Sequence, residues 1–223
     1  RLYLPHDGSP PDNPELLLIL IPGLGGDASS PYMSWVGCMA AQLGVTTLCL
    51  SHRGSGRSTP GFYHAGWYRD VLEAIQHPCL TRYSRRLLAG FSLGGHIAGR
   101  LACSEAGQNQ FMGIFACCSP IDLAETQRHL DHRAWSVYRR YLLSGIKKTA
   151  RALLESVEHK QLAVSPFQQR ELTQALSAKT IGHFDHCATR ALLGYPDQES
   201  YYQGESLIHY LPALHTPLTW ASN

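Results

Sequence analysis

Long apolar runs are missing from this sequence: the longest, residues 16–21, is far shorter than the roughly 20 residues that cross a bilayer as a helix. The first residues also lack the charged and apolar segments of a signal peptide. No block of basic residues alternates with aromatic residues, and the formal net charge is only +2. A nucleic-acid partner is therefore not expected.

Paired cysteine motifs are missing as well. The seven cysteines are an odd number, and no Cys-x-x-Cys pair occurs among them. Several lie in apolar runs, where a free thiol behaves as a small hydrophobic side chain. We therefore expect free thiols and a reducing, cytoplasmic location. The sequence leaves membrane association and oligomeric state open.

The sequence does contain enough apolar material for a sizeable core. Of its 223 residues, 44% are hydrophobic and 16% are charged, with 20 Gly and 13 Pro. This composition is typical of a globular domain and excludes an extended disordered chain.

Apolar runs alternate with segments of helical periodicity in the first half of the chain. Continuous or β-prone runs predict strands at residues 16–21, 45–50, 86–89 and 113–118, the first of these being the first strand of the sheet. Helical spacing predicts helices at residues 35–43, 67–76 and 94–106. This order predicts an α/β fold with a doubly wound, mostly parallel sheet and right-handed crossovers.

After Pro120 the pattern becomes almost wholly helical, up to about Arg190. A Pro/Gly/Tyr-rich loop and a last apolar run, residues 217–221, follow. A helical insertion between sheet strands is typical of a cap over the carboxyl ends of the strands. Helical spacing also leads us to expect that the side chains at positions 135, 138, 141 and 142 form the core of this cap: Trp135, Tyr138, Tyr141 and Leu142.

We therefore divide the chain into three parts. Residues 1–122 form the N-terminal part of the core, residues 123–212 form the cap and its return loop, and residues 213–223 form the next core strand. The C-terminal part of the core is expected to lie beyond this sequence.

Gly90-Phe-Ser-Leu-Gly-Gly95 follows a predicted strand and opens a predicted helix. This strand-turn-helix setting is the one that a nucleophile elbow requires. Ser92 would be the nucleophile, and the Leu93 N–H at the helix start would stabilise an oxyanion. Gly90, Gly94 and Gly95 would allow the close packing of the turn. The alternative is a structural turn in which Ser92 caps the helix.

Pro22-Gly-Leu-Gly-Gly26 ends the first predicted strand in a glycine-rich loop. In an elbow architecture the second oxyanion donor comes from this position, and the N–H of Leu24, which follows Gly23, is the candidate. Such loops also cradle phosphates, but Gly-x-x-x-x-Gly-Lys-Ser/Thr is absent here, which makes a nucleotide site the weaker alternative.

A series of motifs, in order along nearly the whole chain, resembles the YheT-type branch of the α/β-hydrolases, relatives of the eukaryotic ABHD lipases and esterases. These motifs are Pro22-Gly-Leu, Arg53-Gly, Tyr63-His-Ala-Gly66, Gly90-Phe-Ser-Leu-Gly-Gly95, Ser119-Pro-Ile-Asp-Leu123, residues 137–143, Phe184-Asp185, Tyr201-Tyr202 and Tyr210-Leu-Pro212. The resemblance implies a serine hydrolase of carboxylic esters with Ser92 as nucleophile, a helical cap after Leu123, and no cofactor or metal.

The resemblance also implies a triad acid after the strand that ends near Ala221 and a histidine after one more strand. This sequence ends at Asn223 and begins at Arg1 without a methionine. A serine nucleophile needs a base and an acid that orients it. We therefore expect a sequence truncated at both ends.

Other residues could replace the absent acid and base. Asp122 is the acid at a strand end, but its sequence context favours capping of the first cap helix. His96 lies one helical turn after Ser92 and is expected to pack within the helix; His52 and His64 allow structural or site-edge roles. His183 and His186 have a metal-ligand spacing, but a solvated cap helix is the preferred interpretation.

The expected function is hydrolysis of short-chain or lipid-like acyl esters through an acyl-enzyme. The first alternative is an acyltransferase or thioesterase on the same scaffold, since fold does not separate these activities. The second is a catalytically incomplete fragment or pseudoenzyme that binds acyl ligands. The expected partner is a small-molecule or lipid-like ester substrate.

Overall fold

The computed structural model describes residues 1–5, 15–56 and 60–222, and these form two compact units. The first unit comprises Arg1–His52, Ala65–Pro120 and His209–Asn223. The second comprises Arg53–His64 and Ile121–Ile208. The segment Arg53–His64, which the sequence analysis assigned to the core, thus groups with the helical unit.

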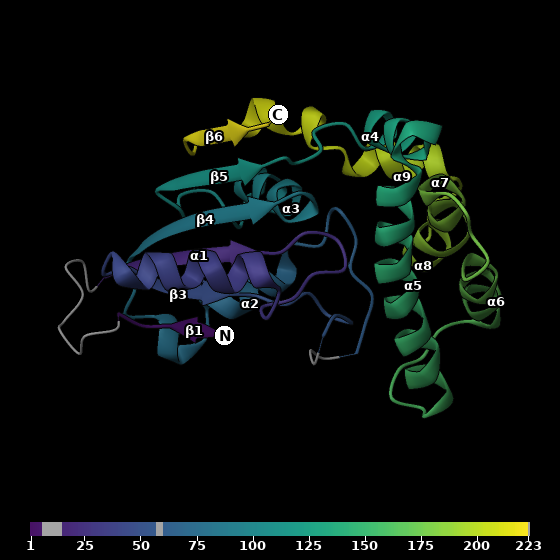
Figure 1. The fold of residues 1–223 in the computed structure, drawn as a ribbon, viewed down its shortest axis with the longest axis horizontal. Helices are drawn as coiled ribbons and strands as arrows, with labels where there is room; N and C mark the ends of the chain where they lie inside the picture. The colour runs from purple at the N-terminus through teal and green to yellow at the C-terminus, as the bar shows by residue number, and fades with distance from the viewer. Residues whose placement is uncertain (6–14, 57–59, 223) are drawn as a thin grey trace. The chain divides into compact units, whose positions relative to one another are not determined.

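The first unit is built on one six-stranded sheet in the order β1-β3-β2-β4-β5-β6 (Figure 1). All neighbouring strands are parallel except β1 and β3, which are antiparallel. The strands are β1 (Leu2–Tyr3), β2 (Leu16–Ile21), β3 (Thr46–Cys49), β4 (Arg85–Phe91), β5 (Gly113–Cys117) and β6 (Leu218–Ala221). The predicted α/β class with a mostly parallel sheet is confirmed. The run predicted as the first strand is in fact the second, because the short β1 precedes it.

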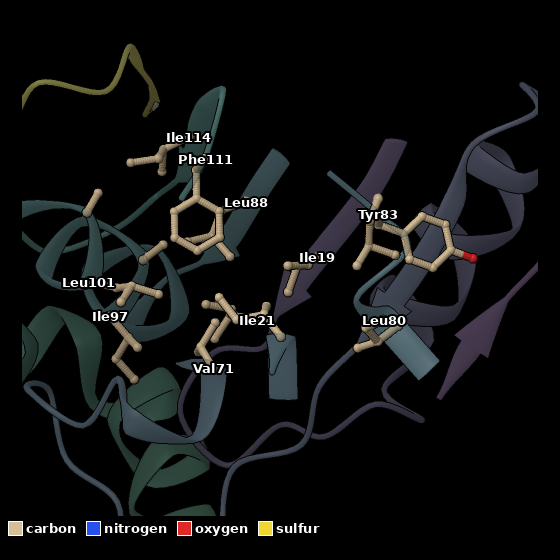
Figure 2. Packing of buried hydrophobic residues seen from close by; sticks show 14 residues of the cluster. Ile19, Ile21, Val71, Leu80, Tyr83, Leu88, Ile97, Leu101, Phe111 and Ile114 are labelled. Carbon is tan, nitrogen blue, oxygen red and sulfur yellow. The ribbon is translucent and has the colours of Figure 1, made fainter. Parts of the chain in front are cut away.

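Helices cover both faces of this sheet. Alternate residues of a strand point to opposite faces, so one strand can pack against helices on both sides. Ile19 and Ile21 of β2 pack with residues of α2 (Arg69–Ile75) and α3 (Leu93–Cys103), as Figure 2 shows for Val71, Ile97 and Leu101. Leu20, next to them in the chain, packs instead with Met33 of α1 (Pro31–Gln42). The sheet is therefore doubly wound. A short 3₁₀ turn, Pro78–Leu80, precedes β4.

The second unit is helical. Its helices are α4 (Leu123–Asp131), α5 (Ser136–Glu158), α6 (Pro166–Ala175), α7 (Ile181–Phe184), a π-helical turn (Asp185–Thr189), α8 (Arg190–Leu193) and α9 (Gln198–Glu205), with 3₁₀ turns at Arg133–Trp135 and Leu207–His209. A further 3₁₀ turn of the first unit, Leu211–Ala213, leads to β6. The sequence predicted a loop where α9 lies. The Asp197 carboxylate starts α9 by accepting the Ser200 N–H at 2.7 Å, which is N-cap geometry.

The expected core of the cap is wrong for its three aromatic residues, of which Trp135 directly precedes α5 and the other two lie in its first turns. Trp135 and Tyr138 are each 42% exposed and Tyr141 is 70% exposed, whereas Leu142 is buried as expected. The buried stripe of this helix is aliphatic and includes Leu142, Leu143, Ile146, Ala150 and Leu153. The aromatic rings fall outside it and stack on one another instead, with Tyr138 and Tyr141 nearly parallel. Helical spacing alone did not show which of two neighbouring stripes is buried.

Candidate active site

Ser92 occupies a strained turn between β4 and α3. Its φ is 51° and its ψ is −123°, a backbone conformation that residues with a side chain rarely adopt. Such a conformation costs on the order of 1–3 kcal/mol and persists only where the surroundings enforce it. Here the Ser92 N–H donates to Cys117 O at the end of β5, at 2.8 Å. The turn is thus held by the neighbouring strand.

Three glycines make this turn sterically possible. A Cβ on Gly90 would lie 2.3 Å from Gly94 O, and a Cβ on Gly94 would lie 2.4 Å from Ile21 O. A Cβ on Gly95 would lie 1.8 Å from the Ser119 Oγ. The first two contacts are with backbone atoms, which cannot rotate away. The α3 helix therefore starts directly against the ends of β2, β4 and β5.

The Ser92 hydroxyl is not used to start the helix. The side chain of Ser92 makes no capping hydrogen bond to α3, although its backbone oxygen accepts the N–H groups of Gly95 and His96. A serine that served only as an N-cap would accept an N–H of the first turn through its Oγ. The geometry favours the nucleophile interpretation of Ser92 over the capping alternative.

The loop after β2 passes directly against Ser92. A Cβ on Gly23 would lie 3.2 Å from Phe91 O and 3.3 Å from the Ser92 Cβ, so the loop backbone reaches the turn. The loop folds back on itself, because Gly26 N–H donates to Gly23 O at 3.0 Å. Leu24 follows Gly23 in this turn and is partly exposed. Leu93 is the first residue of α3, so its N–H has no acceptor within the helix.

Tyr32 holds this loop, a role that the sequence analysis missed. The Gly23 N–H donates to the Tyr32 hydroxyl oxygen at 3.0 Å, and a Cβ on Gly26 would lie 2.8 Å from the same oxygen. The Tyr32 ring packs edge-to-face on Phe91, with centroids 5.1 Å apart. Pro31 could have shown that a helix starts there, because proline is favoured in the first turn of a helix. Tyr32 would then have been placed near the loop.

His52 fixes the same loop from the end of β3. Its Nε2 donates to Pro22 O at 2.9 Å, and Ala28 N–H donates to the Ser51 Oγ at 3.0 Å. Burial lowers the pKa of His52 to about 4, so the ring is neutral near pH 7. The structure therefore gives His52 a structural bond at the edge of the candidate site.

The other residues singled out from the sequence have separate roles. His96 is buried and its Nδ1 donates to Pro120 O at 2.9 Å. Asp122 caps α4 by accepting the Glu125 N–H at 2.9 Å. His64 lies 3.8 Å from the Glu205 carboxylate. Among the described residues, no histidine is hydrogen-bonded to the Ser92 Oγ.

The described part of the chain has neither a cluster of metal ligands nor a membrane-spanning helix. Over residues 1–5, 15–56 and 60–222, no group of three or more His, Cys, Asp or Glu side chains is placed to hold a metal ion. His183 and His186 are both exposed. None of the described helices has the length and apolar content needed to span a membrane.

A sequence profile described as "Alpha/beta hydrolase family" matches residues 18–219, which include the whole elbow and the loop after β2. The chain belongs to the alpha/beta hydrolase family. The role of Ser92 as nucleophile stays a prediction.

Relatives and solved structures agree with this assignment. The chain is 26% identical over 196 residues to the embryogenesis-associated protein EMB8 of Picea glauca, covering 85% of this chain and 42% of that protein. It is 23% identical over 222 residues to a monoacylglycerol lipase of Saccharomyces cerevisiae, covering 93% and 48% respectively. The alpha/beta hydrolase chain thus spans about half the length of these relatives. Its fold is similar to that of a proline iminopeptidase of Mycobacterium smegmatis, with a TM-score of 0.51, 17% identity, and 99% and 76% of the two chains covered.

Proposed function

We propose that this alpha/beta hydrolase cleaves carboxylic esters with short-chain or lipid-like acyl groups, through an acyl-enzyme formed on Ser92. The observation that carries the proposal is the conformation of Ser92, strained at φ 51° and with no capping bond on its hydroxyl. A residue kept in a strained conformation by its neighbours, with its reactive group unused by the fold, fits a nucleophile better than a turn.

In the proposed reaction the Ser92 Oγ attacks the ester carbonyl carbon and its proton passes to a base. The negative charge that develops on the carbonyl oxygen is stabilised by the N–H groups of Leu24 and Leu93. Each such donor is worth about 3 kcal/mol of transition-state stabilisation. The alcohol then leaves with the proton, and water hydrolyses the acyl-enzyme by the reverse sequence of steps.

The two buried histidines described in the first unit are poorly suited to accept the Ser92 proton. Both buried histidines of the first unit, His52 and His96, have a ring nitrogen committed to a backbone carbonyl. The low pKa of His52, lowered by burial to about 4, also makes it a poor acceptor for a serine proton near pH 7. Neither histidine is therefore assigned as the base.

The substrate class rests on the relatives. A monoacylglycerol lipase shares 23% identity over nearly the whole chain, and a mouse protein named phospholipase ABHD3 shares 25% over 90% of it. Both names describe hydrolysis of lipids, and the first describes cleavage of an acylglycerol ester. We therefore propose esters as the substrate class of this chain and do not assign an individual substrate.

The test is labelling with a fluorophosphonate, which reacts with activated serines. We expect the whole natural protein to be labelled, and Ser92→Ala to abolish the labelling and reduce ester hydrolysis by about 10³-fold or more. Ser84→Ala, which changes an exposed serine just before β4, is the matched control and should be labelled normally. The same comparison on the 223-residue chain shows whether it contains its own base.

Absence of labelling in the whole protein, or equal labelling of wild type and Ser92→Ala, would contradict the proposal. A burst assay with an added alcohol then separates the two reactions of an acyl-enzyme. A hydrolase gives mainly free acid at low alcohol concentration, whereas an acyltransferase gives mainly a new ester there and little free acid.

A further inference from the structure

A groove with a volume of about 620 Å³ lies along α5 of the second unit. It is lined by Ser136, Arg139, Arg140, Leu143, Ser144, Lys147, Arg151, Ala178 and Lys179, and we call it the basic groove. Five of these nine residues are cationic and none is acidic. Arg139, Leu143, Lys147 and Arg151 are spaced four residues apart, which places them along one ridge of the helix.

Three of the five cations have no counter-charge in the fold. Arg140, Arg151 and Lys179 are exposed, and within the described part of the chain no acidic side chain forms an ion pair with them. Two other basic residues of this unit do have acidic partners: Arg128 contacts Glu125 at 2.8 Å, and Arg190 contacts Glu171 at 2.9 Å. The basic groove is distinguished by the gathering of five cationic side chains around one hollow whose lining contains no acidic residue.

The other two cations are fixed parts of the groove wall. Arg139 Nη1 donates to the backbone oxygen of Asp131 at 2.6 Å, near the C-terminal end of α4, and its buried Nε has no protein partner. Lys147 Nζ donates to Ala178 O at 2.6 Å. Burial, and secondarily the charge of Arg151, lower the pKa of Lys147. Cations held close together without an anion repel one another, so an added anion would be bound favourably.

We propose that the basic groove binds a phosphate ester, presented either by a soluble phosphorylated molecule or by the headgroup of a phospholipid. Phosphate oxygens match the planar donor fork of arginine, and the groove offers three arginines, two lysines and two serine hydroxyls. The volume falls within the range of small-molecule sites and exceeds what a single carboxylate would fill. None of the lining residues takes part in the proposed hydrolysis, so this proposal does not depend on it.

The experiment measures binding of pyrophosphate by calorimetry, and of vesicles by flotation. The vesicles contain phosphatidylcholine alone or with one fifth phosphatidic acid. The test variant is Arg140→Gln/Arg151→Gln/Lys179→Gln, which leaves the structural bonds of Arg139 and Lys147 in place. The control is Arg133→Gln/Lys148→Gln/Arg170→Gln, which removes the same charge from exposed positions outside the groove.

We expect wild type and control to bind equally, and the groove variant to bind at least about tenfold more weakly. Groove-dependent binding of pyrophosphate but not of vesicles identifies a soluble phosphorylated ligand, and groove-dependent binding of phosphatidic acid vesicles identifies a headgroup. The proposal is overturned if wild type binds neither probe, or if the control loses as much affinity as the groove variant. Circular dichroism of all three proteins checks that each is folded.

Discussion

Around Ser92, backbone atoms pack against backbone atoms, and single glycines decide whether that packing is possible. Gly94 shows this most directly, because the carbonyl oxygens of Ile21 and Pro22 occupy the space that a side chain at this position would need. Each oxygen lies 2.4 Å from an ideal Cβ. Those two carbonyls belong to the end of β2, from which the loop with Leu24 departs. A side chain at position 94 would push α3, and with it the Leu93 N–H, away from the loop that carries Leu24.

We predict that Gly94→Ala lowers ester hydrolysis by at least about 100-fold and lowers the free energy of unfolding by about 2–4 kcal/mol. The physical reason is that the clash involves main-chain atoms and moves the Leu93 N–H. Kinetics and urea unfolding measure the two effects separately.

Gly113→Ala is the matched control. This glycine lies in β5, where an added Cβ would meet the Leu87 side chain at 3.6 Å, an ordinary contact distance. We expect a change of less than about 1 kcal/mol and unchanged hydrolysis. If Gly94→Ala behaves like Gly113→Ala, the close approach of α3 to β2 is not what holds the site.

The spacing of the motif predicted these glycines. Tyr32 was not predicted, and for His52 a structural bond to the backbone was one of the two roles left open, without its partner. Both act through backbone groups of the loop, namely Gly23 N–H and Pro22 O. Pro31 marks a helix start beside Tyr32. Nothing in the local sequence around residue 52 shows which backbone oxygen His52 meets, since that contact exists only after β2 and β3 have paired. The oxyanion donors themselves, Leu24 and Leu93, stay predictions.

At the scale of elements, apolar runs predicted the central strands because these strands are rich in apolar residues, and β2 in particular is largely buried on both faces. The run at residues 16–21 coincides with β2, and the run at 113–118 differs from β5 by one residue. The edge strand β1 was missed because it has two residues and is defined by its pairing with β3. The start of α1 was placed four residues late, since Pro31 sets it and the apolar periodicity begins only later.

The π-helical turn Asp185–Thr189 contains the carboxyl group of Asp185, which accepts two hydrogen bonds, one of them from the last residue of the same turn. Asp185 Oδ1 accepts the Thr189 hydroxyl at 2.6 Å and Oδ2 accepts the Tyr202 hydroxyl at 2.9 Å. Burial raises the pKa of Asp185 from 3.8 to about 6, with a smaller contribution from the charge of Asp131, while the two hydrogen bonds oppose this shift. The same burial raises the pKa of Tyr202, so that group stays neutral.

We predict that Asp185 makes the protein less stable as the pH rises from about 4 to about 6. In this window the folded carboxyl holds a proton that the unfolded one has lost, so stability falls with rising pH and levels off above the folded pKa. Asp185→Asn has no such proton. Between about pH 5 and pH 7 the wild type should therefore lose about 1 kcal/mol relative to this variant.

Thermal melts of both proteins across this range measure the difference, and effects of other groups cancel in the comparison. Asp197→Asn is a suitable control, because this exposed N-cap of α9 has a pKa lowered by hydrogen bonds to Ser200. Its carboxylate is ionised in both the folded and the unfolded state above about pH 5, so the difference from wild type should hardly change with pH in this range. A constant offset between wild type and Asp185→Asn at every pH would show that the Asp185 pKa is ordinary in the folded state.

At the scale of the whole molecule, the seven cysteines report on the packing of both units. All seven are free thiols, as the sequence predicted. Cys49 and Cys103 are buried in the first unit and Cys187 is buried in the second, whereas Cys79 and Cys118 are exposed. Burial raises the pKa of Cys49 to about 11 and also raises the pKa values of Cys103 and Cys187. Thiolate formation and access are therefore both unfavourable at these three positions.

We predict that brief alkylation of the native protein near neutral pH modifies Cys79 and Cys118 first, and Cys49, Cys103 and Cys187 only after unfolding. Mass spectrometry of peptides identifies each site, and Cys79→Ser/Cys118→Ser should remove the fast reaction. Because the buried thiols are divided between the units, the pattern also tests the division of the chain. If Cys187 reacts as fast as Cys118 while Cys49 and Cys103 are protected, the helical unit opens on its own under native conditions. If all three react fast, the packing described for both units is wrong.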